Sequence, residues 1–324
     1  MKDEGPQTNE RVLVMGTGAL GAFFGGRLVQ AGVDVVFVAR GANLAALRRD
    51  GLRIESARGV ERIAPVLVVE TPAEAGPCSV VLVCVKSYDT EVAAAALRPV
   101  VGPETIVLSL QNGIENEARL AAALAVPPLL AGLTHIGAEL VAPGVVHLDS
   151  GGRIIFGELD GAPSVRVARL GALFAGAGID HRASRSIAVM LWDKLAWNAA
   201  FNAATAVTRR TVGELLADDD GRTLVRDAML EVVAVARANG VPLDAARVEE
   251  SLRHSAAELA PLKTSMLQDR ERGRRLEYDA LNGAVLRAAA RHGVRTPVNR
   301  VLHALLAVID ARSAGTGNGS GNGA

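Results

Sequence analysis

The sequence predicts an α/β protein with a parallel-sheet domain in its N-terminal half and an all-α domain in its C-terminal half. From residue 11 to about 184, short β-branched runs alternate with Ala-rich stretches that are long enough for crossover helices. After Ser184 the β-branched runs stop. A chain of 324 residues can also build two cores. We therefore expect a flexible lead over 1–10, a sheet domain over 11–184, a helical domain over 185–312 and a disordered tail over 313–324.

Five apolar runs are expected to form the parallel strands of the first domain. They cover residues 11–15, 34–39, 80–85, 105–108 and 130–134. Between residues 145 and 158, strand-like pieces broken by Gly151, Gly152 and Gly157 indicate an antiparallel extension of the sheet. A helix over 164–176 and a strand over 179–183 would complete this domain.

The second half is expected to consist of consecutive helices over residues 186–310. Glycines and prolines separate them, at Gly213, Gly240, Pro261, Gly293 and Pro297. The Gly/Ser/Asn-rich residues at the C-terminal end have nothing to bury and should remain flexible.

The charge balance excludes several classes of partner. Lys plus Arg and Asp plus Glu both number 35, so no excess charge attracts nucleic acid or an anionic membrane. The polar N-terminus does not look like a signal peptide, and no apolar stretch is long enough to span a bilayer. Cys78 and Cys84 lie too far apart along an extended run for a disulfide and are expected to be buried thiols. We expect a cytoplasmic protein.

The strongest local signal is a glycine-rich turn between the first strand and the first helix. The segment Gly16-Thr17-Gly18-Ala19-Leu20-Gly21 follows the apolar run 11–15. In a Rossmann-type domain the first glycine permits the tight turn, the second admits a pyrophosphate and the third allows close helix packing. We expect these six residues to bind a dinucleotide at the helix N-terminus.

Arg40 bears on the choice of cofactor. It ends the second strand about 20 residues after the glycines, where NAD-binding proteins have an acidic residue for the ribose hydroxyl. A guanidinium suits the 2′-phosphate of NADP instead. The alternative is a solvent-exposed arginine at a strand end.

Two further polar residues follow strand ends. Lys86 comes after the run 80–85, and Asn112 comes after the run 105–108. Ligands of open α/β sheets bind at the carboxyl ends of strands, so both side chains are expected near the cofactor and substrate. For Asn112, which precedes Gly113, an ordinary turn is the alternative.

A polar stripe interrupts an apolar helix in the second domain. Lys194, Asn198 and Asn202 recur at intervals of four and share one helix face. Lys194 could donate a proton to a carbonyl oxygen, and the asparagines could bind substrate or cofactor. A surface salt bridge and interhelical hydrogen bonds are the alternative. The stretch over 263–283 is rich in charged residues and contains Ser265 and Glu277. Considered without the other motifs, it is more typical of a solvated helix face.

Taken together, the motifs resemble the ketopantoate reductase (2-dehydropantoate 2-reductase) family. The resemblance extends along nearly the whole chain. It rests on the motifs GTGALG at 16–21, VKSYD at 85–89, QNG at 111–113, THIG at 134–137, WDKLAWN at 192–198, SMLQD at 265–269 and GRRLEYDALNG at 273–283.

The resemblance implies NADPH-dependent reduction of a 2-keto acid, 2-dehydropantoate to (R)-pantoate. It implies that Lys194 protonates the ketone oxygen and that Glu277 lies in the same site, near cofactor and nascent hydroxyl. Asn198, Asn202 and Ser265 would bind substrate, and Lys86 and Asn112 would lie at the cofactor end, with Asn112 also reaching the substrate. One departure is Leu262, where some members have an asparagine that could bind the substrate.

Two other functions fit the same residues. One is another NADP-dependent hydroxy acid dehydrogenase of the same architecture, since a lysine followed four residues later by an asparagine also occurs in such enzymes. The other is a non-catalytic NADP-binding regulator, against which the presence of both Lys194 and Glu277 argues. The partner expected is a small 2-keto acid, and the sequence leaves the oligomeric state open, a homodimer included.

Overall fold

The computed structural model describes residues 10–124 and 129–316, which form two compact units. Unit 1 comprises Met1–Gln111 and Asn116–Ala188, and unit 2 comprises Asn112–Glu115 and Val189–Ala324. The chain thus enters unit 2 four residues beyond the expected boundary at 184. In addition, the short segment 112–115 packs with the helices of unit 2 although it follows a strand of unit 1.

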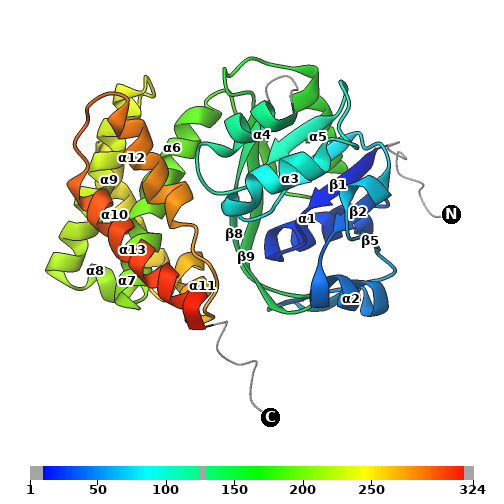
Figure 1. The fold of residues 1–324 in the computed structure, drawn as a ribbon, viewed down its shortest axis with the longest axis horizontal. Helices are drawn as coiled ribbons and strands as arrows, with labels where there is room; N and C mark the ends of the chain where they lie inside the picture. Colours follow the sequence, from blue (N-terminus) through cyan, green and yellow to red (C-terminus); the bar gives the residue numbers. More distant parts are fainter. Residues whose placement is uncertain (1–9, 125–128, 317–324) are drawn as a thin grey trace, which may run out of the picture. The chain divides into compact units, whose positions relative to one another are not determined.

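Unit 1 contains a single mixed sheet, which confirms the predicted α/β class (Figure 1). Among the described residues its order is β4-β3-β9-β8-β7-β6-β1-β2-β5, with β10 paired to β9. The strands are β1 (Arg11–Met15), β2 (Asp34–Val38), β3 (Leu52–Ser56), β4 (Gly59–Ile63), β5 (Leu67–Val69), β6 (Val80–Val83), β7 (Ile106–Ser109), β8 (Leu130–Ala142), β9 (Val145–Gly157) and β10 (His181–Ala183). The pairs β2–β1, β1–β6, β6–β7 and β7–β8 are parallel.

The antiparallel extension differs in detail from the prediction. Residues 145–157 form one continuous strand, not short pieces, and pair antiparallel with β8. Gly151 and Gly152 have φ angles of 77° and 117°, beside a register shift of the ladder. Glycine tolerates this conformation, so the strand passes through a bulge where the pattern indicated a break. The hairpin β3–β4 and strand β5 were not predicted.

Helices cover both faces of the sheet because the side chains of each strand alternate. Val12 and Val14 of β1 belong to an apolar cluster with α1 (Ala19–Gln30), α2 (Gly41–Asp50) and α5 (Val165–Gly176). Leu13 and Met15 belong to a second cluster with α3 (Thr90–Leu97) and α4 (Asn116–Leu124). Two 3₁₀ turns, η1 (Pro72–Ala75) and η2 (Ser87–Asp89), complete this unit. The sheet therefore lies between two packed layers of helices.

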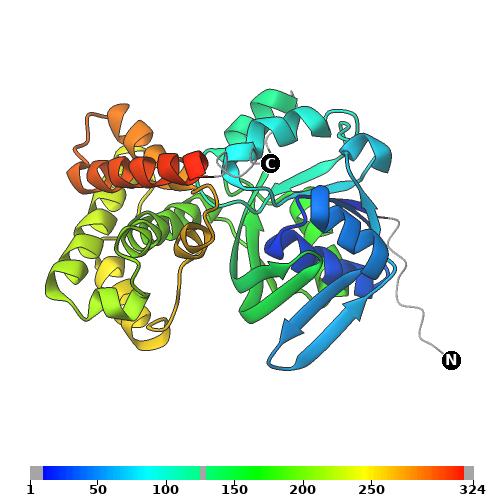
Figure 2. The ribbon, with the colours of Figure 1, turned by 60° about the horizontal axis from the view of Figure 1, so that its bottom comes forward.

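Unit 2 is all-helical, as predicted (Figure 2). Its helices are α6 (Ile187–Trp197, which begins at the end of unit 1), α7 (Ala203–Thr208), α8 (Val212–Leu216), α9 (Asp219–Ala238), α10 (Ala246–Glu258), α11 (Ser265–Glu271), α12 (Ala284–Ala290) and α13 (Pro297–Thr316). Two π-turns, η3 (Asn198–Asn202) and η4 (Asp279–Gly283), adjoin α6 and α12. Their buried apolar residues form one core around Phe201, Val232 and Leu302. Gly213, expected between helices, lies inside α8.

The two predicted ends differ slightly from the structure. Glu10 forms an ion pair with Arg169 of α5 and a hydrogen bond with Ser79, so the lead is shorter than expected. Helix α13 continues to Thr316 and includes the first four residues of the expected tail. The rest of the lead and the tail lie outside the described residues. No helix among the described residues is long and apolar enough to cross a membrane.

Candidate active site

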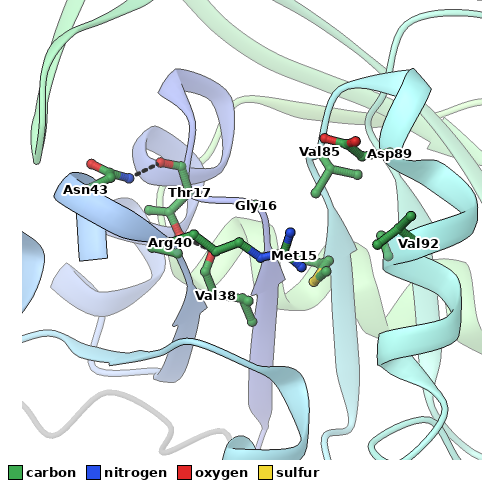
Figure 3. Close-up of a pocket in the computed structure, with 11 residues that line it drawn as sticks. Met15, Gly16, Thr17, Val38, Arg40, Asn43, Val85, Asp89 and Val92 are labelled. Carbon is green, nitrogen blue, oxygen red and sulfur yellow. Dashed lines mark hydrogen bonds between the residues drawn. The ribbon is translucent and has the colours of Figure 1, made fainter. Parts of the chain in front are cut away.

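Unit 1 has a cleft of about 230 Å³ at the carboxyl ends of its central strands (Figure 3). The first two residues of the glycine-rich turn and the ends of β1 and β2 form one side of the cleft. Residues around η2 and α3 form the other side. The lining residues are Met15, Gly16, Thr17, Val38, Ala39, Arg40, Asn43, Val85, Asp89, Val92 and Ala93. The structure thus brings Gly16, Thr17 and Arg40 together around one cleft.

The three glycines of the turn differ in whether a side chain would fit. Gly16 has a φ of 98°, and a β-carbon there would lie 2.7 Å from Val85 Cγ1. At Gly21 a β-carbon would overlap the carbonyl oxygen of Gly16 and lie 2.8 Å from Val14 Cγ1. At Gly18, the N-cap of α1, a β-carbon would have no atom within 4 Å. Gly16 and Gly21 are therefore required for packing, whereas Gly18 leaves open space before the helix N-terminus.

Arg40 is exposed at the N-terminus of α2, and its side chain reaches over the floor of the cleft in Figure 3. Asn43, one turn further along α2, was missed by sequence reasoning. Its side chain donates 2.7 Å to the carbonyl oxygen of Thr17 and accepts 2.8 Å from the amide of Gly144. Asn43 thus ties α2 to the glycine-rich turn. Its only sequence signal was its position three residues after Arg40.

A buried polar network supports the opposite side of the cleft. Gln111 Nε2 donates to the carbonyl oxygen of Val85 (3.1 Å) and to Thr90 Oγ1 (2.9 Å). Thr90 Oγ1 in turn donates 2.8 Å to the carbonyl oxygen of Ser87. Lys86 lies between Val85 and Ser87, half-buried at the start of η2. Both neighbours of Lys86 are therefore held by hydrogen bonds, which restricts where its backbone can move. The QNG motif suggested no such role for Gln111.

Two ionisable residues of unit 2 interact electrostatically. Lys194 lies in the last turn of α6, and Glu277 is buried just before η4. Desolvation lowers the pKa of Lys194 to about 8, while the negative charge of Glu277 opposes this shift. The amine can therefore exchange a proton near neutral pH, as proton transfer to a carbonyl oxygen requires.

Asn198 and Asn202 are buried at the two ends of the π-turn η3. A π-turn has more residues per turn than an α-helix, so each residue advances by a smaller angle. The step from Asn198 to Asn202 thereby counteracts the drift that four α-helical residues produce between Lys194 and Asn198. The three side chains stay closer to one line than a regular helix would allow. Asn198 Nδ2 also donates 3.4 Å to Asn112 Oδ1.

Ser265 is exposed at the first position of α11. The preceding residue, Thr264, caps this helix by accepting from the amide of Leu267, and its hydroxyl lies 2.7 Å from that of Thr205 in α7. The start of α11 is therefore fixed to the helix that follows η3. Leu262 packs against the apolar core of unit 2, which is how an apolar residue is accommodated there.

The predicted site residues thus fall into two groups, one in each unit. Unit 1 holds Gly16 to Gly21, Arg40 and Lys86, and unit 2 holds Asn112, Lys194, Asn198, Asn202, Ser265 and Glu277. No cluster of His, Cys, Asp and Glu side chains suited to a metal ion occurs among the described residues. Cys78 is buried and Cys84 half-buried, and both thiols are free, as expected from their spacing.

Comparison with known proteins shows that both halves of the chain match models of one family. Residues 12–161 match the family described as ketopantoate reductase PanE/ApbA, and residues 186–310 match its C-terminal counterpart. A 2-dehydropantoate 2-reductase of Halobacterium salinarum is 37% identical over 294 residues, covering 90% of this chain and 96% of the relative.

Solved structures agree at the level of the fold. A PanE/ApbA family ketopantoate reductase from Ralstonia eutropha has a TM-score of 0.87 and 36% identity, covering 94% of this chain and 99% of that one. A D-mandelate dehydrogenase solved with NADH and anilino(oxo)acetate also has a TM-score of 0.87, covering 94% and 99%. At 22% identity, this second likeness concerns the fold alone.

Proposed function

Because the chain belongs to the ketopantoate reductase family, whose models together span most of it, we propose that it reduces 2-dehydropantoate to (R)-pantoate with NADPH. The observation on which this proposal depends most is the pair Lys194 and Glu277, at the positions that the family motifs assign to catalysis and with an electrostatic interaction between them. The product would serve the biosynthesis of pantothenate and coenzyme A in the cytoplasm.

Lys194 is proposed as the general acid. The ketone oxygen gains negative charge as its carbon is reduced, and a protonated amine within hydrogen-bond distance can neutralise it. A pKa near 8 leaves the amine mostly protonated at neutral pH, yet acidic enough to release its proton. Glu277 favours the charged amine and, as a carboxylate, can accept a hydrogen bond from a substrate hydroxyl.

The amides and the serine are proposed to bind the substrate. Asn198 and Asn202 present side-chain amides on the same side of the helix as Lys194. The hydroxyl of Ser265 is exposed at a helix N-terminus, where a carboxylate is favourably placed. Together these groups provide donors for the keto acid carboxylate and for the terminal hydroxyl of 2-dehydropantoate.

The cleft in unit 1 fits a dinucleotide phosphate. The pyrophosphate is proposed to lie beside Gly18, where a β-carbon would meet no atom within 4 Å, and the α1 N-terminus favours its charge. The exposed guanidinium of Arg40 suits a 2′-phosphate and offers nothing specific to an unmodified ribose hydroxyl. When bound, NADPH supplies the hydride. Lys86 and Asn112 would bind the cofactor's reactive end, with Asn112 also oriented by Asn198.

A spectrophotometric assay of NADPH oxidation tests this function. The purified chain is mixed with NADPH and a panel of 2-keto acids: 2-dehydropantoate, its analogue without the terminal hydroxyl, pyruvate and phenylglyoxylate. We expect the highest kcat/KM for 2-dehydropantoate, and higher kcat/KM with NADPH than with NADH. Preference for another keto acid would identify a different hydroxy acid dehydrogenase. Absence of turnover with all of them, despite NADPH binding, would favour the regulator.

A further inference from the structure

A buried asparagine outside the predicted site connects the segments that hold Lys194 and Glu277. Asn282 belongs to the π-turn η4, which begins two residues after Glu277. Its side-chain Nδ2 donates 2.8 Å to the carbonyl oxygen of Ala199, in the π-turn η3 that follows Lys194 and Trp197. A π-turn interrupts the regular hydrogen-bond ladder of an α-helix. The carbonyl oxygen of Ala199 accepts a hydrogen bond from a residue outside its own helix.

Two more residues continue this connection into the core of unit 2. Asn282 Nδ2 also donates 3.1 Å to Asn299 Oδ1, and Asn299 Nδ2 donates 2.8 Å to Glu231 and 3.0 Å to the carbonyl oxygen of Ala228. The Glu231 carboxylate accepts the amides of Val298 and Asn299 in the first turn of α13, at 2.8 and 2.9 Å. Asn282 and Asn299 are fully buried. The two long helices α9 and α13 therefore hold Asn282 in one orientation.

The side chain of Asn282 is not optimal for stability alone. Both hydrogens of its amide are used, but its Oδ1 is buried and accepts no hydrogen bond from any residue that the structure describes. A buried polar atom without a partner typically costs about 1–3 kcal/mol. An amide at this position thus combines a cost in stability with two donors aimed at specific acceptors, one of them in η3.

We propose that Asn282 is a positioning residue, which sets the separation between Lys194 and Glu277 by joining the π-turn after Lys194 to the π-turn after Glu277. The proposal rests on the function proposed above, in which Lys194 donates the proton and Glu277 acts on its pKa. Asp193, the neighbour of Lys194 on α6, is paired with Arg247 at 2.8 Å. Glu277 is the charged group that acts on the pKa of Lys194.

The consequence is a measurable change in the titration of Lys194. Glu277 raises the pKa of Lys194 against the lowering effect of burial. If the hydrogen bond from Asn282 maintains their separation, its loss lets the carboxylate move away and the pKa falls. Glu277→Gln removes the charge altogether and defines the largest fall that this mechanism can produce. Asn282→Leu, which has the same branched arrangement of heavy atoms as asparagine but cannot donate a hydrogen bond, should give a value between the wild type and Glu277→Gln.

The sequence is well suited to a direct measurement, because it contains only four lysines: Lys2, Lys86, Lys194 and Lys263. Reductive methylation with ¹³C-formaldehyde labels each amine, and NMR spectra recorded against pH report each pKa without any turnover. A Lys194→Arg variant identifies the Lys194 signal by its disappearance. Failure of the wild type to reduce 2-dehydropantoate would refute the proposed function and leave this measurement intact.

Asn239→Ala is a matched control. Asn239 Nδ2 also donates to two helix carbonyl oxygens of unit 2, those of Val235 and Ala288, and neither acceptor belongs to η3. The expected result is an unchanged pKa of Lys194 in Asn239→Ala and a fall of about half a unit or more in Asn282→Leu. With an active wild type, kcat should drop in Asn282→Leu by about tenfold, and the KM for NADPH should change little.

A second variant guards against misfolding. Asn282→Ser keeps a small hydroxyl that can bond to its own helix, but it is too short to bridge to η3. It should lower the pKa of Lys194 as Asn282→Leu does. A pKa in both variants that equals the wild-type value, rises above it or falls below that of Glu277→Gln would overturn the proposal.

Discussion

Glu277 raises the pKa of Lys194, and desolvation lowers it more strongly, so that the amine titrates with a pKa of about 8. The pair gives a first prediction, for the pH dependence of catalysis. A general acid must be protonated, so kcat/KM should be constant below this pKa and fall as pH rises through about 8. In Glu277→Gln the fall should begin at lower pH, because the charge that favours the ammonium is gone. A pH profile of kcat/KM for both proteins measures this, and coincident profiles would contradict it.

Removal of the amine should affect the chemical step and leave cofactor binding intact. Lys194→Ala is expected to lower kcat by about 100-fold or more, the usual scale of general acid catalysis. NADPH affinity, measured by fluorescence titration, should remain within about twofold of the wild type, since Lys194 does not line the cleft in unit 1. Wild-type turnover in this variant would show that the proton comes from another group.

Arg40 provides a prediction on cofactor choice. Arg40→Ala should weaken the binding of NADPH by up to a few kcal/mol, which is the range of one charge-assisted contact to a phosphate. The binding of NADH should be weakened far less. Arg48→Ala, on the same helix but outside the cleft, is the control. Dissociation constants for both cofactors test the assignment, and equal losses for NADPH and NADH would rule it out.

The glycine-rich turn allows two roles to be separated by two alanine substitutions. Gly18→Ala meets no atom within 4 Å and needs no positive φ, so the melting temperature should stay close to that of the wild type. NADPH should nevertheless bind more weakly, because the added methyl occupies the space for the pyrophosphate. Gly21→Ala meets Val14 and the Gly16 carbonyl, so it should lower the melting temperature by several degrees. Calorimetry and cofactor titration of both variants distinguish packing from binding. Similar melting temperatures for the two variants would contradict this division.

A buried carboxyl in unit 1 predicts how stability depends on pH. Burial raises the pKa of Glu117, in the first turn of α4, from 4.5 to about 7. Its protonated form is therefore favoured in the fold. The associated stability is present below pH 4.5 and is lost as pH rises to about 7, by up to roughly 3 kcal/mol. Glu117→Gln should remove this loss and be the more stable protein at pH 8. Glu104→Gln, which changes an exposed carboxyl, should retain it. Denaturant unfolding at several pH values tests the difference.

The sequence by itself determined those elements whose signal is local. The bounds of β1 match the predicted run, and β2, β6 and β7 differ from it by one or two residues, because period-two and β-branched patterns are read along a single strand. The order of glycines likewise predicted the turn between β1 and α1, since Gly16 and Gly21 each leave no room for a β-carbon beside their neighbours. The change to an all-α second half followed from the loss of β-branched runs.

Only the tertiary structure decided the features that depend on residues far apart in the chain. Strand β3 pairs with β9, almost a hundred residues later, and nothing within residues 52–56 specifies that partner. In the sequence, Gly151 and Gly152 indicated a break between strands. In the structure, the hydrogen-bond ladder with β8 continues on both sides of them, and the strand forms a bulge there. The π-turn at Asn198–Asn202 receives a hydrogen bond from Asn282, 83 residues away, and a helical repeat read from sequence assumes a regular turn. Hydrogen-bond partners of this kind are chosen by packing, so they become visible only once the helices are placed.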